Sequence, residues 1–251
     1  MGRLNTKHVR FYADGYDLSG DTSSIGPLMC DFPVEEMTGL NWAVKGSLLG
    51  QPTIGIGTLN GVFNSATSGL HELAAAANAE RSCMVAIGDA AAPAKGDPVF
   101  CGKFAQKSYQ GVPGEVMITA TAEFGPQYAA SLNYDDPWGD LLHAYGEETA
   151  ANTGSGVDGS SATSAGGYMV YQIFSVTGES GSVTISVEDS VDTDDGNFGE
   201  LLTSGAIDVG DIPCAGIVQL GTTATVKQYT RWQIAFDTAT AATFALAFVR
   251  G

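Results

Sequence analysis

The sequence predicts an all-β protein: an antiparallel β-sandwich or barrel unit with one short helix, followed by a C-terminal β-sandwich portion. Strand-like apolar segments recur at spacings of roughly 10–20 residues and are separated by turn residues, which is typical of such folds. No strand–helix–strand alternation occurs, so a Rossmann-type fold is disfavoured. Because 44% of the 251 residues are hydrophobic, the chain can bury a real core and is not a disordered acidic polypeptide.

Residues 1–127 are expected to form the first β unit, which begins with a polar, Gly-rich N-terminal arm around a short strand at 9–12. The segment 53–63 alternates apolar and small residues, as a strand with one buried face does. Between them, at about 36–52, apolar residues follow no clear periodicity, which indicates a long loop or a β-hairpin. Its apolar side chains need another surface to cover them. We therefore expect contacts between subunits at five residues of this loop and of the N-terminal arm: Trp42, Leu48, Leu49, Val9 and Phe11.

The strongest helix signal in the chain covers residues 68–78. Ser68 can cap this helix, and its apolar residues share one stripe. Strands are expected to follow at 82–87, 98–109 and 114–124. In the last of these, alternate residues are expected to point inward: Val116, Ile118, Ala120, Ala122 and Phe124.

Residues 128–167 read as a loop-rich connector, because 150–167 consists almost wholly of small and polar residues. Residues 168–251 are expected to form the C-terminal β-sandwich portion. Its strand candidates lie at 168–176, 182–187, 216–220, 223–237 and 243–250. Apolar side chains alternate in the last two: Trp232, Ile234 and Phe236, then Phe244, Leu246 and Phe248.

The negative charge of the chain is concentrated in its middle. No Lys or Arg occurs between Lys107 and Lys227, and this stretch holds 17 of the 28 acidic residues of a chain whose formal net charge is −17. Such a sequence lacks the basic patch that neutralises phosphates in nucleic-acid binding. An acidic sequence is often simply soluble, but the surplus also suits a surface past which DNA moves without sticking.

We find no constellation of catalytic residues in the sequence, and we expect neither an enzyme nor a bound cofactor. Neither a G-x-S-x-G nor an H-E-x-x-H motif occurs, and no histidine has a second His or Cys at ligand spacing. His71, on the expected helix, is interpreted as a partner of a backbone carbonyl. Four pairs of adjacent carboxylates are expected to be solvated, because neighbours on a strand point apart: 35–36, 135–136, 147–148 and 194–195.

Metal sites and cysteine chemistry are also disfavoured. The four cysteines are scattered without a C-x-x-C pair, and their apolar neighbours indicate buried free thiols. The loop 192–200 departs from a calcium-binding EF-hand loop in the positions of its Gly and Glu, so a polar turn is favoured over a loose Ca²⁺ site. The chain shows no apolar run long enough for a membrane span and no signal-peptide pattern, so we expect no membrane anchor and synthesis in the cytoplasm.

Several segments follow one another in an order that resembles major tail (tail tube) proteins of long-tailed, siphovirus-type bacteriophages. In the first half these segments are 17–20, 34–40, 59–64, the helix at 70–73, the turn at 96–98 and the run 109–124. In the second half, pieces similar to the β-sandwich extensions of such proteins are 141–143, 157–159, 166–168, 186–192 and 229–232.

The resemblance implies a structural protein of the virion tail, made in the host cytoplasm. Subunits of this kind close into rings, expected to be hexameric, which stack into a tube around a tape-measure protein. Further partners implied are the tail terminator and the baseplate or tail-tip proteins, and genome DNA passes through the tube without specific binding. The N-terminal arm and the long loop would then supply contacts between rings, and the acidic surface would line the channel.

Two other classes of protein stay open at this point. One is a different phage β-sandwich protein, such as a head-decoration, minor tail or host-binding protein. The other is a secreted glycan-binding module or β-sandwich hydrolase. The latter needs an export signal and a carboxylate or aromatic platform, and the sequence shows neither.

Overall fold

Strands dominate the protein, and the predicted all-β fold class is confirmed. The computed structural model describes residues 8–37, 46–67, 69–76, 79–89, 91–127 and 132–251, and its sheets are built from antiparallel strand pairs. None of the helices in these residues has the length and apolar character needed to cross a bilayer.

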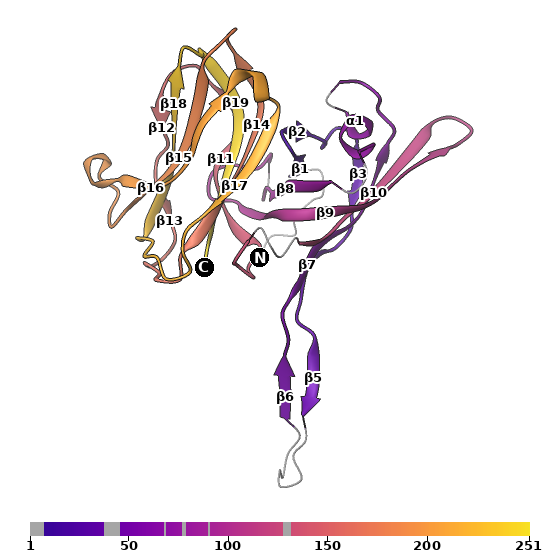
Figure 1. Ribbon diagram of the computed structural model, residues 1–251, viewed down its shortest axis with the longest axis horizontal. Coiled ribbons are helices and arrows are strands. Elements are labelled where there is room, and N and C mark those ends of the chain that lie inside the picture. The colour runs from indigo at the N-terminus through magenta and orange to yellow at the C-terminus, as the bar shows by residue number, and fades with distance from the viewer. Residues whose placement is uncertain (1–7, 38–45, 68, 77–78, 90, 128–131) are drawn as a thin grey trace.

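The elements of the two halves occupy opposite sides of the molecule, and one hairpin extends far from the body (Figure 1). The first half contains β1 (Val9–Ala13), β2 (Tyr16–Asp17), β3 (Thr22–Ile25), β4 (Leu28–Asp31), β5 (Val34–Met37), β6 (Gly46–Leu49), β7 (Thr53–Val62), α1 (Leu70–Ala74), β8 (Glu80–Ile87), β9 (Pro98–Pro113) and β10 (Ile118–Gln127). The second half contains β11 (Trp138–Glu148), β12 (Asn152–Thr153), β13 (Val157–Asp158), β14 (Gly167–Thr177), β15 (Ser182–Ser190), β16 (Gly199–Asp208), β17 (Cys214–Gln219), β18 (Tyr229–Asp237) and β19 (Ala241–Arg250).

Hydrophobic cores separate successive layers of strands in the described part of the chain. The first core lies between the layer of β7 and β10 and the layer of β1, β8 and β9. A second lies between β1, β8 and β9 and the sheet of β11, β14 and β19. A third lies between that sheet and the sheet of β15, β16 and β18. The two halves therefore share a continuous apolar interface and are not separated by solvent.

The strand β19 lies between two of these cores, and its sequence is apolar on both faces. Phe244, Leu246 and Phe248 point into the core of the sandwich, as their alternation predicts. The alanines between them, Ala245 and Ala247, are also fully buried and face the first half of the chain. A strand buried on both faces reads as a continuous apolar run, and small side chains let the neighbouring layer approach closely.

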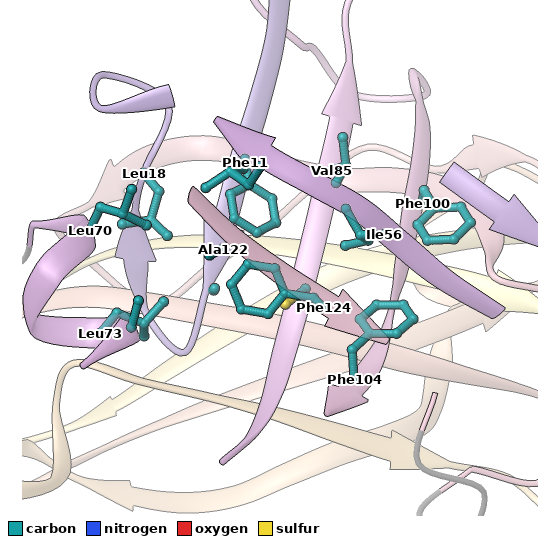
Figure 2. Close-up of a cluster of buried hydrophobic side chains, with 14 of the residues drawn as sticks. Phe11, Leu18, Ile56, Leu70, Leu73, Val85, Phe100, Phe104, Ala122 and Phe124 are labelled. Atoms are coloured by element: carbon teal, nitrogen blue, oxygen red, sulfur yellow. The ribbon is translucent and has the colours of Figure 1, made fainter. Parts of the chain in front are cut away.

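The core of the first half is drawn in Figure 2, where Phe11 from β1 lies close to Phe124 from β10. Their ring centroids are 5.7 Å apart, within the range favoured by aromatic pairs. Leu70 and Leu73 from α1 close one end of this core, and both side chains are buried.

The helix is shorter than the sequence predicts, spanning Leu70–Ala74 instead of 68–78. Its first amide, that of Leu70, donates to the carboxylate of Asp21 at 2.9 Å. At its other end the guanidinium of Arg81 donates to the carbonyl of Leu73, and the amide of Gln106 donates to that of Ala74, each at 2.5 Å. Side chains from distant parts of the sequence therefore satisfy backbone amides and carbonyls at both ends of the helix, so a helix of a single turn is stable. The predicted cap, Ser68, lies outside the described residues.

The prediction of a loop-rich connector at 128–167 is wrong for part of its length, because β11 contributes eleven residues of strand. This strand pairs with β9 through Trp138–Asp140 and with β19 along most of its length. It carries Leu141 and Leu142, each about 1% exposed, in a context too polar for the strand to be recognised from sequence. β11 therefore joins the sheets of the two halves. The division of the chain into units with boundaries at residues 127 and 168 remains a prediction.

A buried amide adds a polar link between the halves. Gln172 on β14 is fully buried. Its Oε1 accepts the amide of Gly15 at 2.7 Å, and its Nε2 donates to the carbonyl of Ser82 at 2.8 Å. Gly15 has φ +82°, and a Cβ at this position would meet the backbone of Cys214 at 2.5 Å. Only a glycine allows so close an approach between the turn after β1 and the sandwich.

Candidate assembly surface

The described residues bring no catalytic or metal-binding constellation together. No group of three or more His, Cys, Asp or Glu side chains there has the arrangement of a metal site. In the loop after β15, the carboxylate of Asp192 accepts the Asn197 side-chain amide at 3.0 Å and the Asp194 backbone amide at 3.0 Å. These contacts hold a polar turn, as the sequence favours.

His71 and His143 pack against and hydrogen-bond to neighbouring residues of the fold. His71 contacts the hydroxyl of Tyr109 at 2.9 Å, so the expected backbone carbonyl partner is replaced by a side chain. His143 is buried against Phe244, with ring centroids 3.9 Å apart. Burial lowers the pKa of His143, and its hydrogen bond to Glu148 opposes this effect. His143 is therefore a neutral core residue at pH 7.

The cysteines are free thiols, but the prediction that all four are buried is only partly right. Cys83 and Cys101 are buried, whereas Cys30 and Cys214 are partly exposed. Burial raises the pKa of all four thiols, that of Cys214 to about 11. Since the thiolate is the reactive form, these cysteines are poor nucleophiles at neutral pH.

The segment at about 36–52 was expected to be a long loop or a β-hairpin, and its described residues belong to a two-stranded ribbon, as in the second alternative (Figure 1). We call residues 31–51 the arm; it is separate from the N-terminal arm named in the sequence analysis. The ribbon prolongs the β4–β7 pair, whose last residue pair is Asp31 and Thr53. Leu48 and Leu49 are 53% and 71% exposed. Val34 lies opposite Leu49 and is 61% exposed. The contact role predicted for Leu48 and Leu49 stays a prediction, and Trp42 lies outside the described residues.

The other two predicted contact residues lie in the body. Phe11 is fully buried in the first core, so in this conformation its side chain offers no surface to a second subunit. Val9 is partly buried and packs against the same core. Both side chains lie on the same face of β1, because residues two apart on a strand point the same way, and that face packs on the first core.

A second exposed apolar surface was missed by the sequence reasoning. β9 and β10 run past the neighbouring strands and form a free hairpin, which Figure 1 shows extending beyond α1. We call residues 112–118 the tip. Val116 and Ile118, both expected to point inward, are 94% and 43% exposed, and Val112 and Met117 are each 52% exposed. A possible signal was the turn at 113–114 between two strands longer than their neighbours.

These two hairpins gather most of the exposed large apolar side chains of the described residues. Of the twelve such side chains, four lie on the arm and four on the tip, and Val62 lies on β7 beside the base of the tip. Surface apolar residues scattered singly are ordinary, whereas clusters mark interaction sites. The body of the subunit is therefore well covered, and its two protrusions are not.

A groove opens between β1 and β3, which are neighbours in space but are not paired with each other. Its volume is about 570 Å³. Its apolar lining residues are Val9, Phe11, Ile25, Leu28, Val85 and Ile87, but the side chains of Phe11 and Val85 are buried in the core. Another part carries the hydroxyls of Ser19, Thr22, Ser23 and Ser24. Arg10 is the charged residue of this lining, which contains no acidic residue.

The acidic surplus is unevenly distributed over the fold. Of the 17 acidic residues between Lys107 and Lys227, four precede residue 138 and thirteen lie in the sandwich half. Several of the latter pair with cations: Arg231 contacts Glu188 and Asp195, both at 2.7 Å, and Lys227 contacts Asp189 at 3.0 Å. Over the whole sequence, residues 138–251 hold 14 acidic and three basic residues, whereas residues 1–137 hold 14 acidic and eight basic residues, so the larger net negative charge lies in the sandwich half.

Comparisons with known proteins carry no argument for the fold or the function of this chain. No protein-family model and no curated protein matches the sequence. Among solved structures the chain is similar to the Dit protein (gp 19.1) of phage SPP1, described as a paradigm of the hub adsorption apparatus in phages that infect Gram-positive bacteria. The identity is 11% and the TM-score 0.33, over 96% of this chain and 99% of that chain. Values this low transfer no function to the present chain.

Proposed function

We propose that this chain is a structural subunit of a bacteriophage tail, and more narrowly a tail tube protein that assembles into stacked rings. The observation that carries the proposal is the concentration of exposed apolar side chains on two hairpins that leave an otherwise covered body. The order of sequence segments that resembles tail tube proteins supports the same function. Self-assembly, and not catalysis, is the role that these features support.

The arm is a structure that needs a partner. An isolated two-stranded ribbon is marginally stable in water, and it normally needs packing on one face. Full burial of a Val or Leu side chain contributes about 1.5–3 kcal/mol. Covering the exposed parts of Val34, Leu48 and Leu49 would therefore contribute roughly 3 kcal/mol per arm. Because each subunit in a ring carries one arm, this stabilisation is repeated around every contact between rings.

The remaining partners follow from the same proposal. A tube of this kind would enclose a tape-measure protein, end at terminator and tip proteins, and pass genome DNA without binding it. Most of the acidic surplus lies on the sandwich, so it lines the channel only if the sandwich faces inward. If the sandwich faces outward, the same charge keeps long tubes from bundling.

The proposal is tested by negative-stain microscopy of the purified protein and of an arm-less variant. The backbone of Gly50 already donates to the carbonyl of Pro33 at 2.8 Å, so residues 34–49 can be replaced by an Asn-Gly turn. The wild-type protein is expected to form rings and tubes. The arm-less variant should keep its melting temperature and form no tubes.

A matched control is Val191→Ser, which removes an apolar side chain that is 66% exposed but lies on neither hairpin. This variant should form tubes as the wild type does. Tubes of normal length from the arm-less variant would remove the arm from assembly. Wild-type protein that stays monomeric or trimeric would instead favour a head-decoration, minor tail or host-binding protein.

A further inference from the structure

We propose that the arm of one copy of this chain docks on the outer face of β7, β10 and β9 of a second copy, and that this contact joins one ring to the next. The inference rests on the proposed function and deepens it by naming the surface that receives the arm. We call this surface the receiver face and define it by two rows of side chains: Val62, Thr119 and Val112 in the first row, and Asn60, Thr121 and Gln110 in the second.

Strand pairing places the two rows on one face of three neighbouring strands. The residue at the centre of each row, Thr119 or Thr121, lies directly opposite its two neighbours on the flanking strands. Directly opposed side chains of an antiparallel pair project from the same face of the sheet. Ala120 and Ala122, which alternate with the central residues along β10, are buried in the first core. The two rows therefore lie on the face of the sheet that is turned away from this core.

The receiver face is exposed and carries no charge. The ends of the first row, Val62 and Val112, are 42% and 52% exposed. None of the six side chains is ionisable, although the chain has 28 acidic residues. The hydroxyl of Thr119 and the amide of Asn60 donate to the Val112 carbonyl at 3.4 Å and to the Ser24 hydroxyl at 3.1 Å. A partner can therefore cover these polar groups without leaving them unsatisfied, and the lack of charge is typical of the centre of an interface.

The arm has the chemistry that such a surface accepts. On one face of its ribbon, Val34 and Leu49 lie opposite each other and are 61% and 71% exposed. Residues 31–51 hold three acidic residues and one lysine. The sandwich half, with 14 acidic and three basic residues, would repel a ribbon of this charge, whereas an uncharged face would not.

The other exposed large apolar side chains of the described residues offer the arm no cluster. Outside the two hairpins and Val62, they are three residues that lie apart from one another: Trp138 and Tyr145, seven positions apart on β11, and Val191 after β15. The receiver face adjoins the apolar tip through Val112. It is therefore the described surface that best matches the apolar face of the arm.

The arm cannot reach the receiver face of its own subunit. It continues the β4–β7 pair beyond Asp31 and Thr53, and Thr53 is the first residue of β7. The first row lies at Val62, the last residue of β7, and a strand of this length spans about 30 Å. To fold back over this distance, the ribbon would have to break the ladder between β4 and β7. The occupant must therefore be the arm of a second copy.

The two partners of this contact lie towards opposite ends of β7, so the contact is heterologous. Figure 1 shows the arm and the β9–β10 hairpin leaving the body in different directions. Heterologous contacts build open filaments unless the rotation between copies closes a ring. Subunits stacked by this contact all have the same orientation along the stack. One end of the tube therefore presents arms, and the other end presents receiver faces.

Substitutions at the centre of the first row test the receiver face. Thr119→Glu places a carboxylate where the arm docks and should lower the mass of tubes by about tenfold, while rings remain. Thr119→Val keeps the shape of the side chain and should form tubes as the wild type does. Ala235→Glu is a matched control, because Ala235 is an exposed strand residue of the sandwich, and it should also form tubes. Normal tubes from Thr119→Glu would overturn the inference.

Cross-linking tests the contact between two copies even if Thr119→Glu fails to fold. Cys30 and Cys214, the two partly exposed cysteines, are first changed to Ser. Protein with Leu49→Cys is then mixed with protein carrying Thr119→Cys, assembled and oxidised. We expect a disulfide between the two proteins, identified by the mass of the linked peptides. A mixture of Leu49→Cys with Ala235→Cys should give none.

The cross-linking result separates the inference from the proposed function. If the wild type forms tubes but the Leu49→Cys and Thr119→Cys mixture gives no more disulfide than the control mixture, the arm is not on the receiver face and the proposed function stands. If the wild type forms neither rings nor tubes, the proposed function fails and the inference fails with it.

Discussion

Replacing Gln172 by Leu removes the polar link between the two halves while keeping a side chain of similar size. Gln172 is fully buried and serves two backbone groups, the amide of Gly15 and the carbonyl of Ser82. The two groups are affected differently. The carbonyl of Ser82 still accepts the amide of Asp14 at 3.0 Å, whereas the amide of Gly15 loses the acceptor given by Gln172.

The size of the effect follows from this asymmetry. One lost hydrogen bond costs about 1 kcal/mol, and one buried donor left unsatisfied costs about 1–3 kcal/mol. We therefore expect the free energy of unfolding to fall by about 2–4 kcal/mol. For a chain of this size that corresponds to a decrease in melting temperature of about 4–16 °C.

The assay is thermal and urea unfolding of unassembled subunits, followed by tryptophan fluorescence and far-UV circular dichroism. The control is Gln219→Leu, because Gln219 accepts the amide of Asn133 at 2.9 Å in an exposed setting where water can replace it. The control should stay within about 1 kcal/mol of the wild type. A loss of unfolding free energy below about 0.5 kcal/mol for Gln172→Leu, which is within the noise of such data, would contradict this prediction.

Further predictions concern the backbone, pH, proteolysis and DNA. Gly15→Ala should destabilise by about 2 kcal/mol more than Gly96→Ala in urea unfolding, because both have positive φ (+82° and +85°) but only Gly15 meets backbone atoms within 3 Å. Equal losses of unfolding free energy in the two variants would show that the backbone strain at positive φ is the whole cause. Because burial lowers the pKa of His143, its contribution to stability is full above about pH 6.5 and falls as the pH drops towards the folded-state value. His143→Gln should flatten this slope in melting curves from pH 8 to 5.5, and an unchanged slope would contradict it. Subtilisin should first cut unassembled subunits within 150–165; trypsin has no Lys or Arg to cut there. Gel-shift assays at low salt should detect no DNA binding, and retention of DNA would count against a passive channel.

Periodicity predicted much of the fold because many strands bury one or two faces. The alternation of Trp232, Ile234 and Phe236 gave β18, and that of Phe244, Leu246 and Phe248 gave β19. Local sequence could not reveal β11, since its strand is defined by partners at Phe100 and Ala247 that are remote in the chain. The short helix likewise ends where the side chains of Arg81 and Gln106 donate hydrogen bonds to its last carbonyls.

The candidate assembly surface was only partly predictable. The aperiodic segment with Leu48 and Leu49 was recognised because exposed apolar residues need a partner. Val116 was placed inside because its alternation with Ile118 and Ala120 continues the pattern of a buried strand. Periodicity reports which residues share a face, but it does not report where the neighbouring strand stops, and β7 ends at Val62. The groove depends on two strand edges meeting in space and has no local signature.

The position of β19 between β14 and β11 has a consequence for synthesis on the ribosome. β11 pairs with the earlier strand β9 only through residues 138–140, and most of its length pairs with β19, which is made about a hundred residues later. Its apolar side chains therefore stay incompletely covered until the last described strand is made. Both hairpins that we assign to assembly emerge earlier still. A nascent chain therefore exposes the apolar side chains of both hairpins before the sheets of its sandwich are complete. Neighbouring nascent chains on one polysome would then associate prematurely. Chaperone binding during that interval would keep neighbouring nascent chains apart until residues 241–250 are released.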